Sequence, residues 1–139
     1  MPAALQSIGS ACFSGAGENV YIDTIPDNLM VIPSSCFYNC PNVSINHFPE
    51  RSQDCSIGFG AFIGCGVSGA VTSITIESPW RFSSPDSNYG IFDRGSSKTG
   101  YYNVTDIYLH SGLYSLGDDA IRMIMFGNNP REYTLHQLT

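Results

Sequence analysis

The chain has 139 residues, a net charge of −6 and 13% charged residues, about half the roughly 25% typical of soluble domains. Its six basic residues are scattered, so binding to nucleic acid through phosphate contacts is not expected. Insertion into a membrane is not expected either, because the sequence lacks an apolar run of about 18 residues.

The N-terminal segment MPAALQSIGS lacks the basic and apolar regions of a secretory signal. Either the protein is not secreted by that route, or its signal lies outside this sequence.

A degenerate unit recurs along the chain. It reads LQSIGSACF from Leu5 to Phe13, LMVIPSSCF from Leu29 to Phe37 and CSIGFGAF from Cys55 to Phe62, with weaker copies in GIFDRG and LYSLGDDAI. The equivalent apolar positions are spaced by 24, 25, 30 and 29 residues, at Phe13, Phe37, Phe62, Phe92 and Ile121. A stack of repeats tolerates such variation when insertions fall in loops. We therefore expect a repeat array in which these side chains form a buried ladder.

Short segments between these units have the pattern of strands. VTSITI, from Val71 to Ile76, and VTDIYL, from Val104 to Leu109, combine β-branched and polar residues with a period of two at their ends. This pattern is typical of half-buried strands. A variant frame, V-x-I-x-x-[IF]-P, occurs in VYIDTIP and VSINHFP, and YTLHQLT at the C-terminus fits the same frame. The segments predict one short strand per repeat.

In the variant frame, Asp23 and Asn46 occupy the position of Ile74 and Ile107. This difference indicates a local shift in register or a bulge, and it leaves open whether the two polar side chains face inward or outward. The first residues, MPAAL, fit the end of a further strand, so the chain opens and closes at matching points of the repeat. We therefore expect about five irregular repeats with uncapped ends, consistent with a fragment of a longer array.

These segments resemble the BspA-type (Treponema pallidum-type) leucine-rich repeat family, whose unit is approximately LxxIxIPxxVxxIGxxAFxxC. The likeness is closest in Pro26 to Cys40, Gly58 to Cys65 and Val104 to Ile121, and the stretches 80–88 and 93–103 depart from it. The resemblance implies a β-rich solenoid: a right-handed coil with a parallel β-sheet on one face and loops or short helical turns on the other. It also implies a role in adhesion or protein binding, often at a cell surface. The length of the chain suits one domain, which we expect over residues 1–139.

The five cysteines fit the repeat better than they fit a disulfide framework or a metal site. Their number is odd, and the sequence contains no C-x-x-C pair of the kind that binds zinc. Cys12 and Cys36 precede a ladder Phe directly, and Cys40 and Cys65 follow one by three residues. Small buried thiols pack well at such positions, although a functional thiol or a Cys12–Cys36 disulfide remains an alternative.

The sequence contains no convincing catalytic motif. Ser111, His110 and Asp106 are the residue types of a hydrolase triad, but the G-x-S-x-G turn is absent, and adjacent strand residues point to opposite faces. Asn42 and Asn103 begin N-x-S/T glycosylation motifs, but each directly precedes a strand, and we interpret them as turn residues. Glycosylation is the alternative if the protein is secreted through a glycosylating pathway. We therefore expect no enzymatic activity, no cofactor and no metal.

We interpret the protein as a non-catalytic interaction module. The candidate surface is the exposed face of the sheet, formed by Tyr21, Ser44, Asn46, Ser73, Thr75, Glu77, Asp106, Tyr108 and His110. A second candidate is the 79–88 loop with Trp80, Arg81 and Phe82, residue types common at interface hot spots. The alternative for this loop is that its aromatic residues fold onto the side of the array.

The expected partner is a protein, or a glycan, and the uncapped ends suggest contacts with further copies or components. The family resemblance favours a location at the cell surface or outside the cell. The alternative function is a structural component of a larger assembly, such as a virion or fibre, or of an assembly inside the cell.

Overall fold

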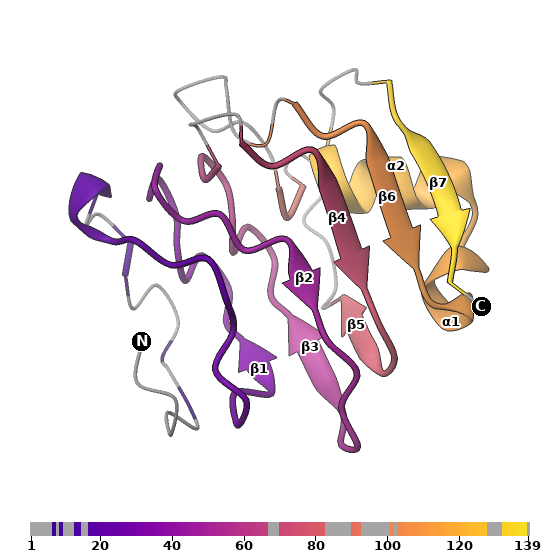
Figure 1. Cartoon of the computed structure of the whole chain (residues 1–139), viewed down its shortest axis with the longest axis horizontal. Coiled ribbons are helices and arrows are strands. Elements are labelled where there is room, and N and C mark those ends of the chain that lie inside the picture. Colours follow the sequence, from indigo (N-terminus) through magenta and orange to yellow (C-terminus); the bar gives the residue numbers. More distant parts are fainter. Residues whose placement is uncertain are drawn as a thin grey trace.

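The computed structural model describes residues 7, 9, 13–14, 17–66, 70–82, 90–92, 101, 103–127 and 132–138. Within these residues the strands form two parallel sheets, shown in Figure 1. One sheet has four strands in the order β2-β4-β6-β7, and the other has three in the order β1-β3-β5. Each later strand pairs with the corresponding strand of the preceding repeat, so the fold is a repeat fold, as the sequence predicted.

The four-stranded sheet contains β2 (His47–Phe48), β4 (Ser73–Ile76), β6 (Asp106–Leu109) and β7 (Thr134–Gln137). Its strands were predicted in VSINHFP, VTSITI, VTDIYL and YTLHQLT, and the structure confirms all four, although the first is only two residues long. Burial alternates along β4 and β6, so every second side chain faces the core. The predicted strand in VYIDTIP is reduced to an isolated bridge between Ile22 and Val43.

The variant frame produces the local shift that the sequence indicated. Ile45 and Phe48 are both buried, with two residues between them, whereas the buried residues of β4 are Ile74 and Ile76. The additional outward residue is Asn46, which is half-buried. Its side-chain amide donates a hydrogen bond of 3.2 Å to the carbonyl of Ser73 in the next repeat. The polar residue of the variant frame thus faces outward and links two repeats.

The second sheet was not predicted. It contains β1 (Val31–Ile32), β3 (Cys55–Ile57) and β5 (Trp80–Phe82), in the register Ile32–Ile57–Phe82. The expected side opposite the first sheet was loops and short helical turns. That expectation holds for part of this side: Phe37 and Phe62 lie in tight turns over residues 34–39 and 59–64, and α1 (Ser111–Tyr114) and α2 (Asp118–Phe126) follow β6. The difference is that extended segments precede these turns in the earlier repeats, where β1, β3 and β5 satisfy their backbone groups by pairing with each other.

The aromatic ladder connects the repeats through their interior. Phe37 stacks on Phe13 and on Phe62 with ring centroids 5.4 and 5.6 Å apart, and Phe62 stacks on Phe92 at 5.1 Å. The turns that carry these rings are also hydrogen-bonded, since each Phe amide donates to the carbonyl just before the next ladder position. Burial of these rings therefore contributes apolar stabilisation between successive repeats.

The last position of the ladder was assigned wrongly. Ile121 was expected there, but the amide of Phe92 donates to the carbonyl of Met125, so the equivalent residue is Phe126. Ile121 is buried within α2. The helix inserts residues into this repeat, which moves the ladder position toward the C-terminus.

Within the described chain, Cys36, Cys40, Cys55 and Cys65 are buried thiols. Two of them reach back to the ladder: Cys40 Sγ donates to the carbonyl of Phe13 and Cys65 Sγ to that of Phe37, both at 3.1 Å. Desolvation raises the pKa of the Cys65 thiol well above its ordinary value. The predicted packing role is therefore confirmed for Cys36, Cys40 and Cys65, whereas Cys12 lies outside the described residues.

Candidate functional site

The alternation of β4 and β6 creates an outward surface on the four-stranded sheet. Ile74, Ile76, Ile107 and Leu109 point into the core, so their neighbours point outward. We call this surface the outer face, and it consists of the outward residues Ser44, Asn46, His47, Ser73, Thr75, Glu77, Asp106, Tyr108, Thr134 and His136. Most of these side chains are half-buried, because each is flanked by its partners on the neighbouring strands.

Three side chains on β6 and β7 form a pre-ordered group. The rings of Tyr108 and His136, which are cross-strand partners, stack with centroids 4.4 Å apart and an interplanar angle of 13°. His136 Nε2 is hydrogen-bonded to Asp106 Oδ1 at 2.8 Å, and Thr105 Oγ1 donates to Asp106 Oδ2 at 2.8 Å. These hydrogen bonds, from His136 first and Thr105 second, lower the pKa of the Asp106 carboxyl, so it is ionised at neutral pH.

A second histidine–carboxylate pair lies nearer the N-terminal side of the outer face. His47 Nε2 is 2.5 Å from Glu77 Oε2, across the boundary between two repeats. Both side chains are partly exposed, at 56% and 35% of their side-chain surface. The two pairs have the same construction: an imidazole of one repeat contacts a carboxylate of an adjacent repeat.

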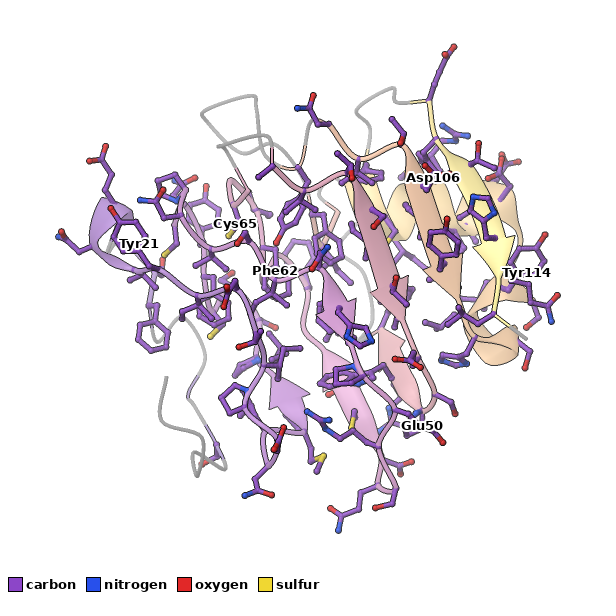
Figure 2. All side chains as sticks on the ribbon, in the orientation of Figure 1. Tyr21, Glu50, Phe62, Cys65, Asp106 and Tyr114 are labelled. Atoms are coloured by element: carbon purple, nitrogen blue, oxygen red, sulfur yellow. The ribbon has the colours of Figure 1, made fainter. Side chains whose placement is uncertain are left out.

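Tyr21 lies at the N-terminal side of the array, with 76% of its surface exposed. It lines a shallow recess with Ile22, Asp23, Asn42 and Ser44. Figure 2 shows Tyr21 and Asp106 toward opposite ends of the array. The predicted surface residues of the first sheet therefore extend along the array and do not converge on a pocket.

The 79–88 segment differs from its prediction. Trp80 was expected in an exposed loop, but it is fully buried in β5, where its ring lies 5.4 Å from that of Phe48. Its indole N–H donates to the carbonyl of Pro49 at 2.7 Å. Trp80 cannot contact a partner in this position, and we remove it from the candidate surface. For Trp80, the structure instead confirms the alternative prediction, in which the aromatic side chain packs onto the array.

Arg81 and Phe82 are also strand residues of β5, exposed and half-buried respectively. They belong to the second sheet, so the structure does not bring them together with the outer face. Residues 83–88 of the predicted loop lie outside the described part of the chain.

His110 follows β6 but turns away from the outward row. Its Nε2 is 2.7 Å from the carbonyl oxygen of Trp80, at the corner between the two sheets. The triad-like set of Ser111, His110 and Asp106 is thus not assembled, because Asp106 is bound to His136 instead.

Asn42 was interpreted as a turn residue. Its side-chain amide donates a hydrogen bond of 3.0 Å to the carbonyl of Glu18.

Sequence reasoning missed three residues of the outer face: His47, Thr134 and His136. Thr134 and His136 could have been found, since YTLHQLT was recognised as a strand and its outward positions follow from alternation. To predict that His136 pairs with Asp106, one must know the register between β6 and β7, and the sequences of the two strands alone do not determine that register.

The described residues contain no group of three or more His, Cys, Asp or Glu side chains placed to hold a metal ion. No described helix has both the length and the apolar character needed to cross a bilayer.

The family of the protein follows from a match to the model of the BspA type leucine rich repeat region, which finds six copies over residues 1–84. This match covers more than half of the chain, and the chain therefore belongs to that family. Comparison with curated proteins and comparison with solved structures each found no match. Leucine-rich repeats commonly mediate protein interactions and are typically not enzymes.

Proposed function

We propose that the protein is a non-catalytic recognition module that binds a partner protein through the outer face. The observation that carries this proposal is the row of half-buried polar and aromatic side chains on adjacent strands β4, β6 and β7. A surface of this kind is polar, weakly charged and pre-ordered, which suits a specific protein contact. The residues proposed to contact the partner are Ser44, Asn46, Ser73, Thr75, Glu77, Asp106 and Tyr108 on the outer face, with Tyr21 next to it at the N-terminal side; His110, Arg81 and Phe82 lie away from this surface and are not included.

The proposed architecture is one right-handed solenoid domain over residues 1–139. Parallel pairing of successive repeats in both sheets supports it, because parallel strands joined by crossovers follow a right-handed path in nearly all proteins. We further propose a role in adhesion or recognition at a cell surface or outside the cell, where proteins of this family are often found. A glycan is an alternative ligand.

The test uses a pair of matched substitutions. Thr75 is at the centre of the outer face and pairs with both His47 and Tyr108, whereas Ser56 is in β3 of the other sheet. Both side chains are half-buried and point away from the core. Thr75→Trp adds bulk without charge to the proposed surface, and Ser56→Trp adds the same bulk to the control surface.

Immobilised wild-type and variant proteins are compared by affinity capture and mass spectrometry, after circular dichroism confirms that all three are folded. We expect specific partners to be retained by wild type and Ser56→Trp and lost with Thr75→Trp. Retention by Thr75→Trp and loss by Ser56→Trp would place the contact on the other sheet and contradict the proposal.

A second candidate is a structural component of a larger assembly, such as a virion or fibre. It is favoured by β7, which among the described residues pairs with β6 alone, because a strand at the edge of a sheet can pair with another chain. The exposed apolar side chains Tyr114, Leu116 and Met123 belong to the helical segment that follows β6. Sedimentation velocity over a range of micromolar concentrations tests it: association that grows with concentration supports the assembly, and a constant monomer contradicts it.

A further inference from the structure

Apart from its histidines, the charged side chains of the outer face are all acidic. Its carboxylates are Glu77 and Asp106, and Asp23 is exposed beside Tyr21 at the N-terminal side. The described basic side chains lie elsewhere: Arg51 in the turn after β2, Arg81 in β5 and Arg122 in α2. Within the described chain, the outer face therefore presents negative charge without an arginine or lysine to neutralise it.

The stacked Tyr108 and His136 rings provide an aromatic platform next to the Asp106 carboxylate. Aromatic faces attract guanidinium and ammonium groups, and guanidinium also stacks on them in a planar arrangement. The platform is held in place before binding, because the stack and the His136–Asp106 hydrogen bond fix both rings. Little conformational entropy would then be lost when a ligand binds.

Asp106 has capacity for further hydrogen bonds. Among the described residues, each of its oxygens has one hydrogen-bond partner, His136 for Oδ1 and Thr105 for Oδ2, while an ionised carboxylate has about four acceptor positions. Its side chain is 40% exposed. An incoming guanidinium can therefore donate to the free positions of this carboxylate while its plane covers the neighbouring ring.

We propose that the outer face recognises a cationic segment of the partner protein, with an arginine of that segment seated on the Tyr108–His136 platform against Asp106. This inference rests on the proposed function and adds the chemistry of the partner. Glu77 and Asp23 extend the negative surface toward Tyr21, so a segment with several basic residues gains additional electrostatic attraction along the array.

The probe is a fluorescein-labelled tetra-arginine peptide, and its comparison is the tetra-citrulline peptide, which has a similar shape and no charge. Fluorescence anisotropy measures binding to wild type, to Asp106→Asn and to Asp119→Asn. Asp119 is an exposed residue in the first turn of α2, so its substitution changes the net charge equally but away from the outer face. Tyr108→Val, which removes the platform but retains a strand-forming residue, is a second variant of the site.

We expect the arginine peptide to bind wild type and the citrulline peptide to bind at least roughly tenfold more weakly. Asp106→Asn and Tyr108→Val should each weaken arginine-peptide binding about five- to tenfold, whereas Asp119→Asn should change it by less than about twofold. Equal losses with Asp106→Asn and Asp119→Asn would show general charge attraction and overturn the inference. Absence of binding to wild type would also overturn it.

Failure of this inference is distinguishable from failure of the proposed function. If Thr75→Trp abolishes partner capture but the arginine peptide does not bind, the outer face binds a partner of different chemistry. If capture is insensitive to Thr75→Trp, the proposed function itself is wrong, whatever the peptide does.

Discussion

Replacing Phe62 by alanine should remove the central contact of the aromatic ladder. The ring is fully buried and packs against four other aromatic rings, with centroid distances of 5.6 Å to Phe37, 5.1 Å to Phe92, 5.8 Å to Phe48 and 6.5 Å to Tyr101. Buried Phe→Ala changes cost about 3–5 kcal/mol, and the loss of several favourable ring pairs places Phe62 near the upper end of that range. Native proteins have free energies of unfolding of about 5–15 kcal/mol. The variant should therefore be mostly unfolded, or folded with little stability left.

Urea denaturation of wild type and variant measures this loss with two probes. Far-ultraviolet circular dichroism follows the strands, and the fluorescence of Trp80, the only tryptophan, follows the core, because its ring is buried against Phe48. The control is Phe59→Ala, the same substitution at a half-buried position three residues before Phe62, with an expected cost of about 1 kcal/mol. A loss at Phe62 no larger than that at Phe59 would refute the ladder as the core of the array.

Tyr101→Phe should cost about 1–3 kcal/mol in the same assay, because its buried hydroxyl donates at 2.7 Å to the carbonyl of Ile45; an unchanged urea midpoint would contradict this. Cys65 of the native protein should resist maleimide labelling at neutral pH, because burial raises the pKa of its thiol. Rapid labelling of Cys65, detected by peptide mapping, would contradict this prediction. Asp106 has a folded-state pKa below its ordinary 3.8, because of its hydrogen bonds from His136 and Thr105, so its ionised form stabilises the fold above that pH. The urea-midpoint difference between wild type and Asp106→Asn should therefore shrink from about pH 5 to about pH 2, and a constant difference would contradict it.

Much of the repeat fold was predictable because the same environment recurs in each repeat. A Phe that must stack on the corresponding Phe of the next repeat is retained at a recognisable position, as at Phe37 and Phe62. The same constraint explains the small thiols beside them. VTSITI and VTDIYL were recognisable as strands because one face packs inward and the other remains partly exposed.

The second sheet and the last ladder position were harder to predict for physical reasons. The strand β1 has two residues and β3 and β5 have three each, which is too short for a period of two to be read. Trp80 looked like a loop residue because Ser and Pro surround it, but pairing with Cys55 and burial against Phe48 determine its position. LYSLGDDAI resembles the repeat unit, yet the helix that begins at Asp118 displaces the ladder position to Phe126.

The candidate site was predictable to the extent that it follows from alternation within one strand. Ser73, Thr75, Asp106 and Tyr108 were correctly placed on one outward row. The group that distinguishes this row, Tyr108 with His136 and Asp106, joins residues thirty positions apart. Its recognition requires the register between neighbouring repeats, and that register depends on how many residues the intervening loops and helices contain.

Hydroxyl-radical footprinting of the protein alone and with its captured partner tests the central claim most directly, because it reports where the partner covers exposed side chains. Tyr21 and Tyr108 report on the recognition surface, while Tyr114 and Met123 report on the helices away from it. We predict that oxidation of Tyr21 and Tyr108 falls on binding and that oxidation of Tyr114 and Met123 does not change. Protection of Tyr114 and Met123, with Tyr21 and Tyr108 oxidised as in the free protein, would contradict recognition through the outer face.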